Sequence, residues 1–111
     1  LNNDTEMTNE NGIFEMVSIC RRERVGVVGA KLNYFDNTVQ HAGVVIGLMG
    51  VAEHVFKGFN SNEDGYMYRL GLTQNYSAVT GACMLVKKSV FELVHGFSED
   101  FPVAFNDIDF C

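Results

Sequence analysis

Two short apolar runs, rich in β-branched and small residues, constrain the fold of this chain most strongly. Residues 25–30 read VGVVGA, and residues 79–86 read VTGACMLV. Runs of this length without polar alternation are typical of strands that are covered on both faces. Segments with helical spacing lie beside both runs, so the sequence predicts an α/β fold in which a mixed sheet has flanking helices.

Two helices are expected beside these strands. Residues 9–22 carry apolar side chains at helical spacing, namely Ile13, Phe14, Val17 and Cys20. A second helix is expected to begin at Ser89, which is spaced from Glu92 as in a capping box. Gly96 fits the left-handed residue that ends many helices.

The middle of the chain is expected to be less regular. Residues 31–34 and 39–46 are predicted to form a hairpin-like pair at a sheet edge, because the intervening FDNT carries turn chemistry. Residues 47–64 have little periodicity and are predicted to be loop, and residues 65–76 are predicted to include a short helix.

Composition excludes several classes of protein. The 111 residues suffice for a single domain, and 47% hydrophobic with 12% aromatic residues is too apolar for intrinsic disorder. A net charge of −6 with only eight Lys and Arg argues against nucleic acid as a partner. An anionic substrate would therefore need a divalent cation or a local positive field to offset this acidity.

Cysteine usage and apolar patterning are consistent with a segment of a cytoplasmic protein. The three cysteines have neither zinc-site nor disulfide-framework spacing, so reduced thiols are expected. No apolar run approaches the roughly 20 residues of a membrane span. The first residues, LNNDTEMTNE, lack signal-peptide features, and we expect the chain to be part of something longer.

The first candidate site is the acidic pair Asp4 and Glu6. Carboxylates two residues apart on an extended segment point the same way, so together they could hold a hard cation such as Mg²⁺, with substrate phosphates completing its shell. The alternative is that these acids only complement the dipole of the following helix, and spacing alone favours this alternative.

The second candidate is FNDIDF, residues 105–110, where acids alternate with bulky apolar residues. Such a setting can suit Asp107 to take a proton from a hydroxyl. An acid that caps a helix is an equally good interpretation of the motif alone. A calcium-stabilised structural domain using Asp107 and Asp109 would need at least six oxygen ligands, and the motif offers too few.

The histidines and glycines carry weaker signals. His41, His54 and His95 have no mutual metal spacing and are expected at the surface or the edge of the core, with His41 the most plausible substrate contact of the three. Gly43, Gly47 and Gly50 lack the following Lys-Ser/Thr of a phosphate-binding P-loop, so loop flexibility is the favoured interpretation.

Four ordered blocks resemble the bacterial family 2 glycosyltransferases, whose catalytic domain has the GT-A nucleotide-diphospho-sugar transferase fold. The blocks are LNNDTE, VGVVGAKLNYFDNTVQHAGVVIG, NYSAVTGACMLVKKSVFELVHGFSEDF and FNDIDFC. The resemblance implies that residues 1–111 form the second half of a GT-A domain, a single partial catalytic domain whose N-terminal nucleotide-binding half is missing.

The resemblance also implies roles for residues. Asp4 matches the aspartate that coordinates Mg²⁺ or Mn²⁺ on the donor diphosphate, Glu6 could contribute through water, and Asn2 replaces the motif's first acid. Asp107 matches the general base, and Asn106 stands where the family commonly has Glu. Donor-sugar or acceptor contacts are expected from the remaining candidates, namely Asn2, His41, Thr80, Gly81, Ala82, Asn106 and Asp109.

The function implied is an inverting, metal-dependent transfer of a sugar from a nucleotide-diphosphate sugar to an acceptor hydroxyl. The acceptor would be a glycan or lipid-linked glycan in bacterial cell-surface polysaccharide synthesis, at the inner face of the membrane through regions outside this chain. The isolated segment is expected to be inactive. The alternative is a non-catalytic carbohydrate-binding or interaction module that retains the GT-A fold, which the replacements at Asn2 and Asn106 suggest.

Overall fold

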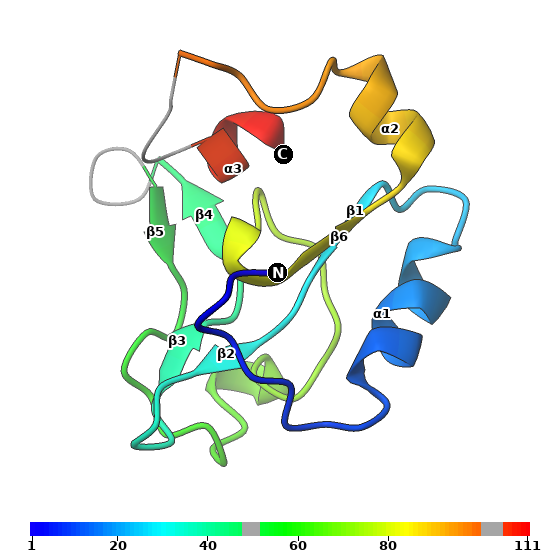
Figure 1. The fold of residues 1–111 in the computed structure, drawn as a ribbon. Coiled ribbons are helices and arrows are strands. Elements are labelled where there is room, and N and C mark those ends of the chain that lie inside the picture. The colour runs from blue at the N-terminus through cyan, green and yellow to red at the C-terminus, as the bar shows by residue number, and fades with distance from the viewer. Residues whose placement is uncertain (48–51, 101–105) are drawn as a thin grey trace. The chain divides into compact units, whose positions relative to one another are not determined.

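The computed structural model describes residues 1–47, 52–100 and 106–111 (Figure 1). The chain folds into two compact units. Unit 1 consists of residues 1–29 and 80–111, and unit 2 consists of residues 30–79. Unit 1 therefore joins the two ends of the chain, which carry both acidic motifs.

Unit 1 is built on one antiparallel strand pair. β1 (Val27–Gly29) pairs with β6 (Met84–Val86), with Val28 opposite Leu85. The Lys87 N–H donates to the Gly26 carbonyl at 2.9 Å, which extends the ladder by one hydrogen bond. The prediction of a strand within residues 25–30 is confirmed, although only Val28 of β1 is buried and its neighbours are half-buried.

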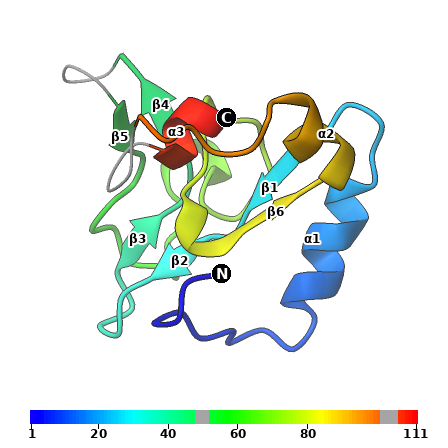
Figure 2. The same ribbon diagram turned by 45° about the horizontal axis from the view of Figure 1, so that its top comes forward.

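The helix α1 (Gly12–Cys20) lies along this strand pair and contacts both strands (Figure 2). It confirms the helix predicted over residues 9–22, although it begins three residues later and ends two residues earlier. Of the predicted apolar face only Cys20 is buried, whereas Ile13 and Phe14 are 58% and 73% exposed. The helical spacing was therefore interpreted correctly, but most of the face is not part of the core.

The strand predicted over residues 79–86 is shorter than expected. A 3₁₀ turn, η2 (Gly81–Cys83), precedes β6. The Thr80 hydroxyl oxygen accepts the Ala82 N–H at 3.4 Å, so a local side-chain bond replaces the start of the ladder. The VTGA run that suggests a strand by its β-branched residues therefore leads into a turn at Gly81.

The capping box predicted for the second helix is wrong. α2 (Lys88–Leu93) has Lys87 at its N-cap with no side-chain hydrogen bond, and Ser89 lies inside the helix. The helix starts earlier because Lys87 is the last residue bonded to the β1 strand region, through Gly26. The predicted left-handed residue is confirmed, since Gly96 has φ of +78° and its N–H donates to the Phe91 carbonyl at 2.9 Å.

Three aromatic rings hold the last helix, α3 (Asn106–Phe110), in unit 1. The Phe97 and Phe110 ring centroids are 4.9 Å apart, and the Phe91 centroid lies 5.7 Å from that of Phe110. Phe110 is buried. This cluster anchors α3 through its C-terminal end and so positions the acids of its first turn.

Unit 2 begins with the predicted hairpin. β2 (Leu32–Asn33) pairs antiparallel with β3 (Val39–His41). Asp36 stabilises the turn, because its carboxylate accepts the backbone N–H and the hydroxyl of Thr38 at 2.9 and 2.6 Å. These two hydrogen bonds favour the charged form and lower the pKa of Asp36.

A second antiparallel pair lies in unit 2. β4 (Val44–Ile46) pairs with β5 (Ala52–His54), and Val44 also bridges to Ala78. β5 falls in the segment predicted to be loop, so that prediction is wrong there. Its pairing with β4 is non-local, which local periodicity does not report. Residues 48–51 of the predicted loop, including Gly50, lie outside the described residues.

The short helix predicted within residues 65–76 is a single 3₁₀ turn, η1 (Tyr66–Tyr68), with Met67 in a left-handed conformation at φ of +52°. The core of unit 2 lies elsewhere. It consists of Val39, His41, Val44, Leu70 and Ala78.

The strand pairs of the described residues are all antiparallel and two-stranded. A mixed sheet needs a parallel pair, and residues 1–47, 52–100 and 106–111 contain none, so that part of the fold prediction is not met there. The GT-A fold and the single partial domain stay predictions. Over the same residues, no helix has the length and apolar character needed to cross a membrane.

The conformation of Gly96 leads to a stability prediction. A Cβ at Gly96 would lie 3.0 Å from the Phe91 ring, whereas a Cβ at Gly58, also left-handed with φ of +82°, would meet nothing within 4 Å. Gly58→Ala should cost about 1 kcal/mol for its backbone alone. Gly96→Ala should cost about 1 kcal/mol more, because the ring must also move.

Urea unfolding of the intact protein measures both costs. Equal losses for Gly96→Ala and Gly58→Ala would contradict the packing described for α2 and the aromatic cluster.

Candidate functional site

The candidate site of unit 1 is centred on the η2 turn. The Thr80–Ala82 segment, predicted to lie against a donor sugar, turns here so that its backbone N–H groups and carbonyls meet two other parts of the chain. Thr80 is extended, with φ of −74° and ψ of 143°, and it introduces the turn. The segment therefore organises the site through its backbone.

Asp107 contacts η2 directly. Its Oδ2 accepts the Gly81 N–H at 2.8 Å, and its Oδ1 accepts the Ile108 N–H at 3.0 Å. A Cβ at Gly81 would lie 3.3 Å from the Asp107 Cβ, which is tighter than ordinary contact. Glycine at this position thus allows Asp107, the predicted base, to approach the turn closely. From the sequence, a donor-sugar contact was instead expected at Gly81.

The N-terminal motif reaches the same turn. The Asn2 N–H donates to the Ala82 carbonyl at 2.8 Å, and Figure 1 shows the N-terminus beside η2. Asn2, Ala82 and Asp107 come from three separate segments. The structure therefore brings together LNNDTE, Thr80–Ala82 and the late acidic motif, and the roles of their residues stay predictions.

The acids of the first motif are accessible. Asp4 and Glu6 are both exposed. Asp4 lies in a turn in which the Thr5 N–H donates to the Asn2 carbonyl at 3.3 Å, so the argument that an extended segment aligns the two carboxylates does not hold. No group of three or more metal-ligating side chains is found in the described part of the chain.

The two acids of the late motif, Asp107 and Asp109, lie in different surroundings. Asp107 is half-buried, Asp109 is exposed, and both lie on the helix α3. Residues two apart on an α-helix project to different sides, so Asp109 does not join Asp107 in one site. This geometry also disfavours a shared calcium ion. Asn106 is half-buried at the first position of α3, and Phe105 of the motif lies outside the described residues.

His41 lies in the core, where the sequence predicted a position at the surface or the core edge, and its substrate contact stays a prediction. His41 is only 1% exposed, and its Nδ1 lies 2.8 Å from the Nδ1 of His54. One ring donates and the other accepts in such a bond. No sequence pattern indicated this pair, because the two histidines are 13 residues apart and meet through the pairing of β4 with β5.

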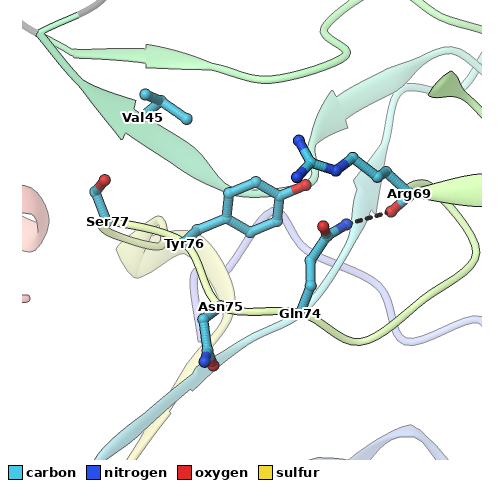
Figure 3. A pocket seen from close by; sticks show the side chains of 6 residues that line it. All are labelled: Val45, Arg69, Gln74, Asn75, Tyr76 and Ser77. Atoms are coloured by element: carbon cyan, nitrogen blue, oxygen red, sulfur yellow. Dashed lines mark hydrogen bonds between the residues drawn. The ribbon is translucent and has the colours of Figure 1, made fainter. Parts of the chain in front are cut away.

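Sequence reasoning also missed a pocket in unit 2. This pocket has a volume of about 440 Å³. It is lined by Val45, Arg69, Gln74, Asn75, Tyr76 and Ser77, which Figure 3 shows. The Tyr76 hydroxyl is buried and has no hydrogen-bond partner among the described residues. Burial raises the pKa of Tyr76, and the nearby Arg69 charge opposes part of that rise. Gln74, Asn75 and Tyr76 fall within the segment predicted to include a short helix, so no sequence pattern indicated the pocket.

Comparison with known proteins gives two partial relatives. The chain is 49% identical over 112 residues to the uncharacterized protein y4gI of Sinorhizobium fredii (strain NBRC 101917 / NGR234), covering 100% of this chain and 12% of that protein. It is 41% identical over 113 residues to the O-antigen biosynthesis protein RfbC of Myxococcus xanthus, covering 98% of this chain and 9% of that protein. No family model and no solved structure matches the chain.

The hydrogen bond between Gly81 and Asp107 predicts a local exchange signature. Asp107→Ala removes the acceptor of the Gly81 N–H, and a bond to a charged group contributes roughly 1.5–3 kcal/mol. Amide hydrogen exchange at Gly81 in the intact protein should therefore become about 10- to 100-fold faster. Asp109→Ala is the matched control and should leave the Gly81 rate unchanged. Slow exchange at Gly81 in both variants would contradict the site geometry.

Proposed function

We propose that this chain is part of an inverting glycosyltransferase that moves a sugar from a nucleotide-diphosphate donor to an acceptor hydroxyl. The relative from Myxococcus xanthus is named for O-antigen biosynthesis, and this supports a role in polysaccharide synthesis. The transfer chemistry is supported by the site around η2 and by the resemblance of the four sequence blocks to family 2 enzymes.

One observation carries the proposal. The Asn2 N–H and the Asp107 carboxylate both bond to the η2 turn, through Ala82 and Gly81 respectively. A helix-capping acid would precede the helix and accept the N–H two or three residues on, whereas Asp107 is the second residue of α3 and its local bond is to Ile108. The additional bond to Gly81, 26 residues away, fixes the carboxylate relative to the N-terminal motif, as a base that works beside a donor diphosphate requires.

Asp107 has the hydrogen-bonding capacity that a base needs. An ionised carboxylate offers about four lone-pair positions, and the Gly81 and Ile108 N–H groups occupy two of them. An acceptor hydroxyl can donate to a remaining position. Asp107 then takes the proton as the hydroxyl oxygen bonds to the anomeric carbon, and the bond from that carbon to the diphosphate oxygen breaks.

The acids near the N-terminus suit a divalent metal. Mg²⁺ is commonly bound by one or two carboxylates together with substrate phosphates, and Asp4 and Glu6 are exposed carboxylates of this kind. Asp4 would hold the ion, with Glu6 acting through water. When bound, the metal neutralises charge on the departing nucleoside diphosphate.

The second candidate function is a non-catalytic carbohydrate-binding module. The replacements at Asn2 and Asn106 favour it, because an amide is a weaker metal ligand than a carboxylate. Such a module would bind saccharide without binding a nucleotide or Mn²⁺. Calorimetric titration of the intact protein with nucleoside diphosphate and Mn²⁺ separates the two functions.

Metal-dependent release of nucleoside diphosphate tests the proposal. The intact protein is incubated with UDP-, GDP- and dTDP-hexoses and a membrane glycolipid extract as acceptor source. Release should stop in EDTA and return with Mn²⁺ or Mg²⁺. Asp4→Asn should raise the metal concentration needed for half-maximal release by roughly tenfold or more.

Glu10→Gln is the matched control, because Glu10 is an exposed acid in the same N-terminal segment. It should leave the metal requirement unchanged. Equal metal requirements in Asp4→Asn and the unsubstituted protein would contradict the ligand assignment. Absence of release from every donor, with binding of saccharide alone, would replace the proposal by the binding module.

A further inference from the structure

The pocket of unit 2 has a chemical character that the transfer chemistry does not use. Among its described lining residues Arg69 is the only charged one, in a chain whose net charge is −6. Its volume of about 440 Å³ lies within the range of small-molecule sites. A pocket with one cation and no carboxylate in its lining favours an anionic ligand.

The floor of the pocket is a fixed aromatic ring. Tyr76 packs against Gly43, whose φ is +124°, and a Cβ at Gly43 would overlap the ring. The ring therefore cannot shift toward Gly43. Its hydroxyl is buried without a partner among the described residues, although a buried hydroxyl normally finds one. A ligand in the pocket would supply the missing partner.

Polar side chains lie at both ends of Tyr76. Figure 3 shows the Arg69 guanidinium beside the Tyr76 hydroxyl, with the Asn75 and Ser77 side chains at the far end of the ring. The Gln74 amide donates to the Arg69 carbonyl at 2.6 Å, which holds Gln74 next to Arg69 and leaves its oxygen as an acceptor. The pocket thus combines a guanidinium and a phenolic donor with an amide oxygen that can accept from a sugar hydroxyl.

We propose that this pocket binds an acidic saccharide, with Arg69 and the Tyr76 hydroxyl holding its carboxylate or phosphate group. The planar guanidinium matches both anions with paired hydrogen bonds. The Gln74 oxygen and the Asn75 amide bind hydroxyls of the attached sugar. The inference rests on the proposed function only in taking a saccharide as the carrier of the anion.

Titration of the intact protein without donor tests the pocket directly. The probes are glucuronic acid, glucose 1-phosphate, glucose and inorganic phosphate, and calorimetry measures the affinity of each. We expect one of the two acidic sugars to bind at least tenfold more tightly than glucose, and the tighter one identifies carboxylate or phosphate as the anion. Equal affinity for glucose, or no binding of either acidic sugar, would overturn the proposal. If inorganic phosphate binds as tightly as glucose 1-phosphate, the sugar contributes no affinity, and the proposal that the ligand is a saccharide is overturned.

Substitutions locate the binding in this pocket. Arg69→Gln should weaken the affinity for the acidic sugar by about 10- to 100-fold, because a charge-assisted bond is lost. Arg69→Lys keeps the charge but not the planar pair of donors, and it should weaken binding less. Lys57→Gln removes an exposed cation of unit 2 outside the lining and should leave affinity unchanged. Unchanged affinity in Arg69→Gln would overturn the assignment.

Tyr76→Phe separates a ligand-binding hydroxyl from a structural one. If the hydroxyl had a structural role, its removal would lower stability. We expect Tyr76→Phe instead to lose affinity for the acidic sugar and to keep the melting temperature of the ligand-free protein. The raised pKa of Tyr76 gives a second readout. Above the unfolded pKa of about 10, the unfolded chain releases the tyrosine proton more readily than the folded chain, so the protein loses stability as the pH rises. Phenylalanine does not ionise, so the variant should lose less stability there.

A melting temperature lowered at neutral pH by Tyr76→Phe, with affinity unchanged, would assign the hydroxyl a structural role and overturn its place in the site. Because no donor or turnover is involved, failure of this binding test leaves the transferase proposal standing. Conversely, an inactive protein can still bind the acidic sugar.

Discussion

The hydrogen bond from the Gly81 N–H to the Asp107 carboxylate is the constraint on which the candidate site depends. At 2.8 Å it joins two segments separated by 26 residues, and its charged acceptor makes it stronger than a neutral bond. Gly81 must lack a side chain for this approach, since a Cβ would crowd the Asp107 Cβ. The rings of Phe91, Phe97 and Phe110 hold α3 from its other end. One acid is thereby positioned by a turn, a helix and an aromatic cluster.

The polar centres of the two units have opposite electrostatic character. In unit 1 the η2 turn gathers the segments that carry Asp4 and Asp107, so the site is acidic and suits a metal and a proton acceptor. In unit 2 the pocket has Arg69 as its charged residue and a partnerless Tyr76 hydroxyl among the described residues. The proposed proton transfer and the proposed anion binding need these different environments.

Local patterns predicted much of the fold but little of the packing. α1 and β1 were found because helical spacing and a short apolar run are encoded within single segments. β5 was missed because Ala52–His54 becomes a strand only by pairing with β4. The turn at η2 was missed because a Thr80 side-chain bond, invisible to periodicity, replaces a ladder bond.

The candidate site shows the same division. Ordered motifs placed Asp107, Thr80–Ala82 and the N-terminal residues in one site, and the structure joins these segments. Burial is a property of the whole unit, so His41 could not be recognised as a core residue from its neighbours in sequence. For the same reason the pocket around Tyr76 was not predicted, because the packing of its ring against Gly43 depends on tertiary contacts.

The most direct measurement of the central claim is turnover of the intact protein with Asp107→Asn. The amide oxygen can still accept the Gly81 N–H, so the bond between the two segments is retained, whereas the amide NH2 replaces the oxygen that accepts the Ile108 N–H and cannot take a proton. The account predicts that kcat for nucleoside diphosphate release falls roughly 10²- to 10⁴-fold while donor affinity is unchanged. Asp109→Asn on the same helix should retain full activity. Unchanged turnover in Asp107→Asn would contradict the account.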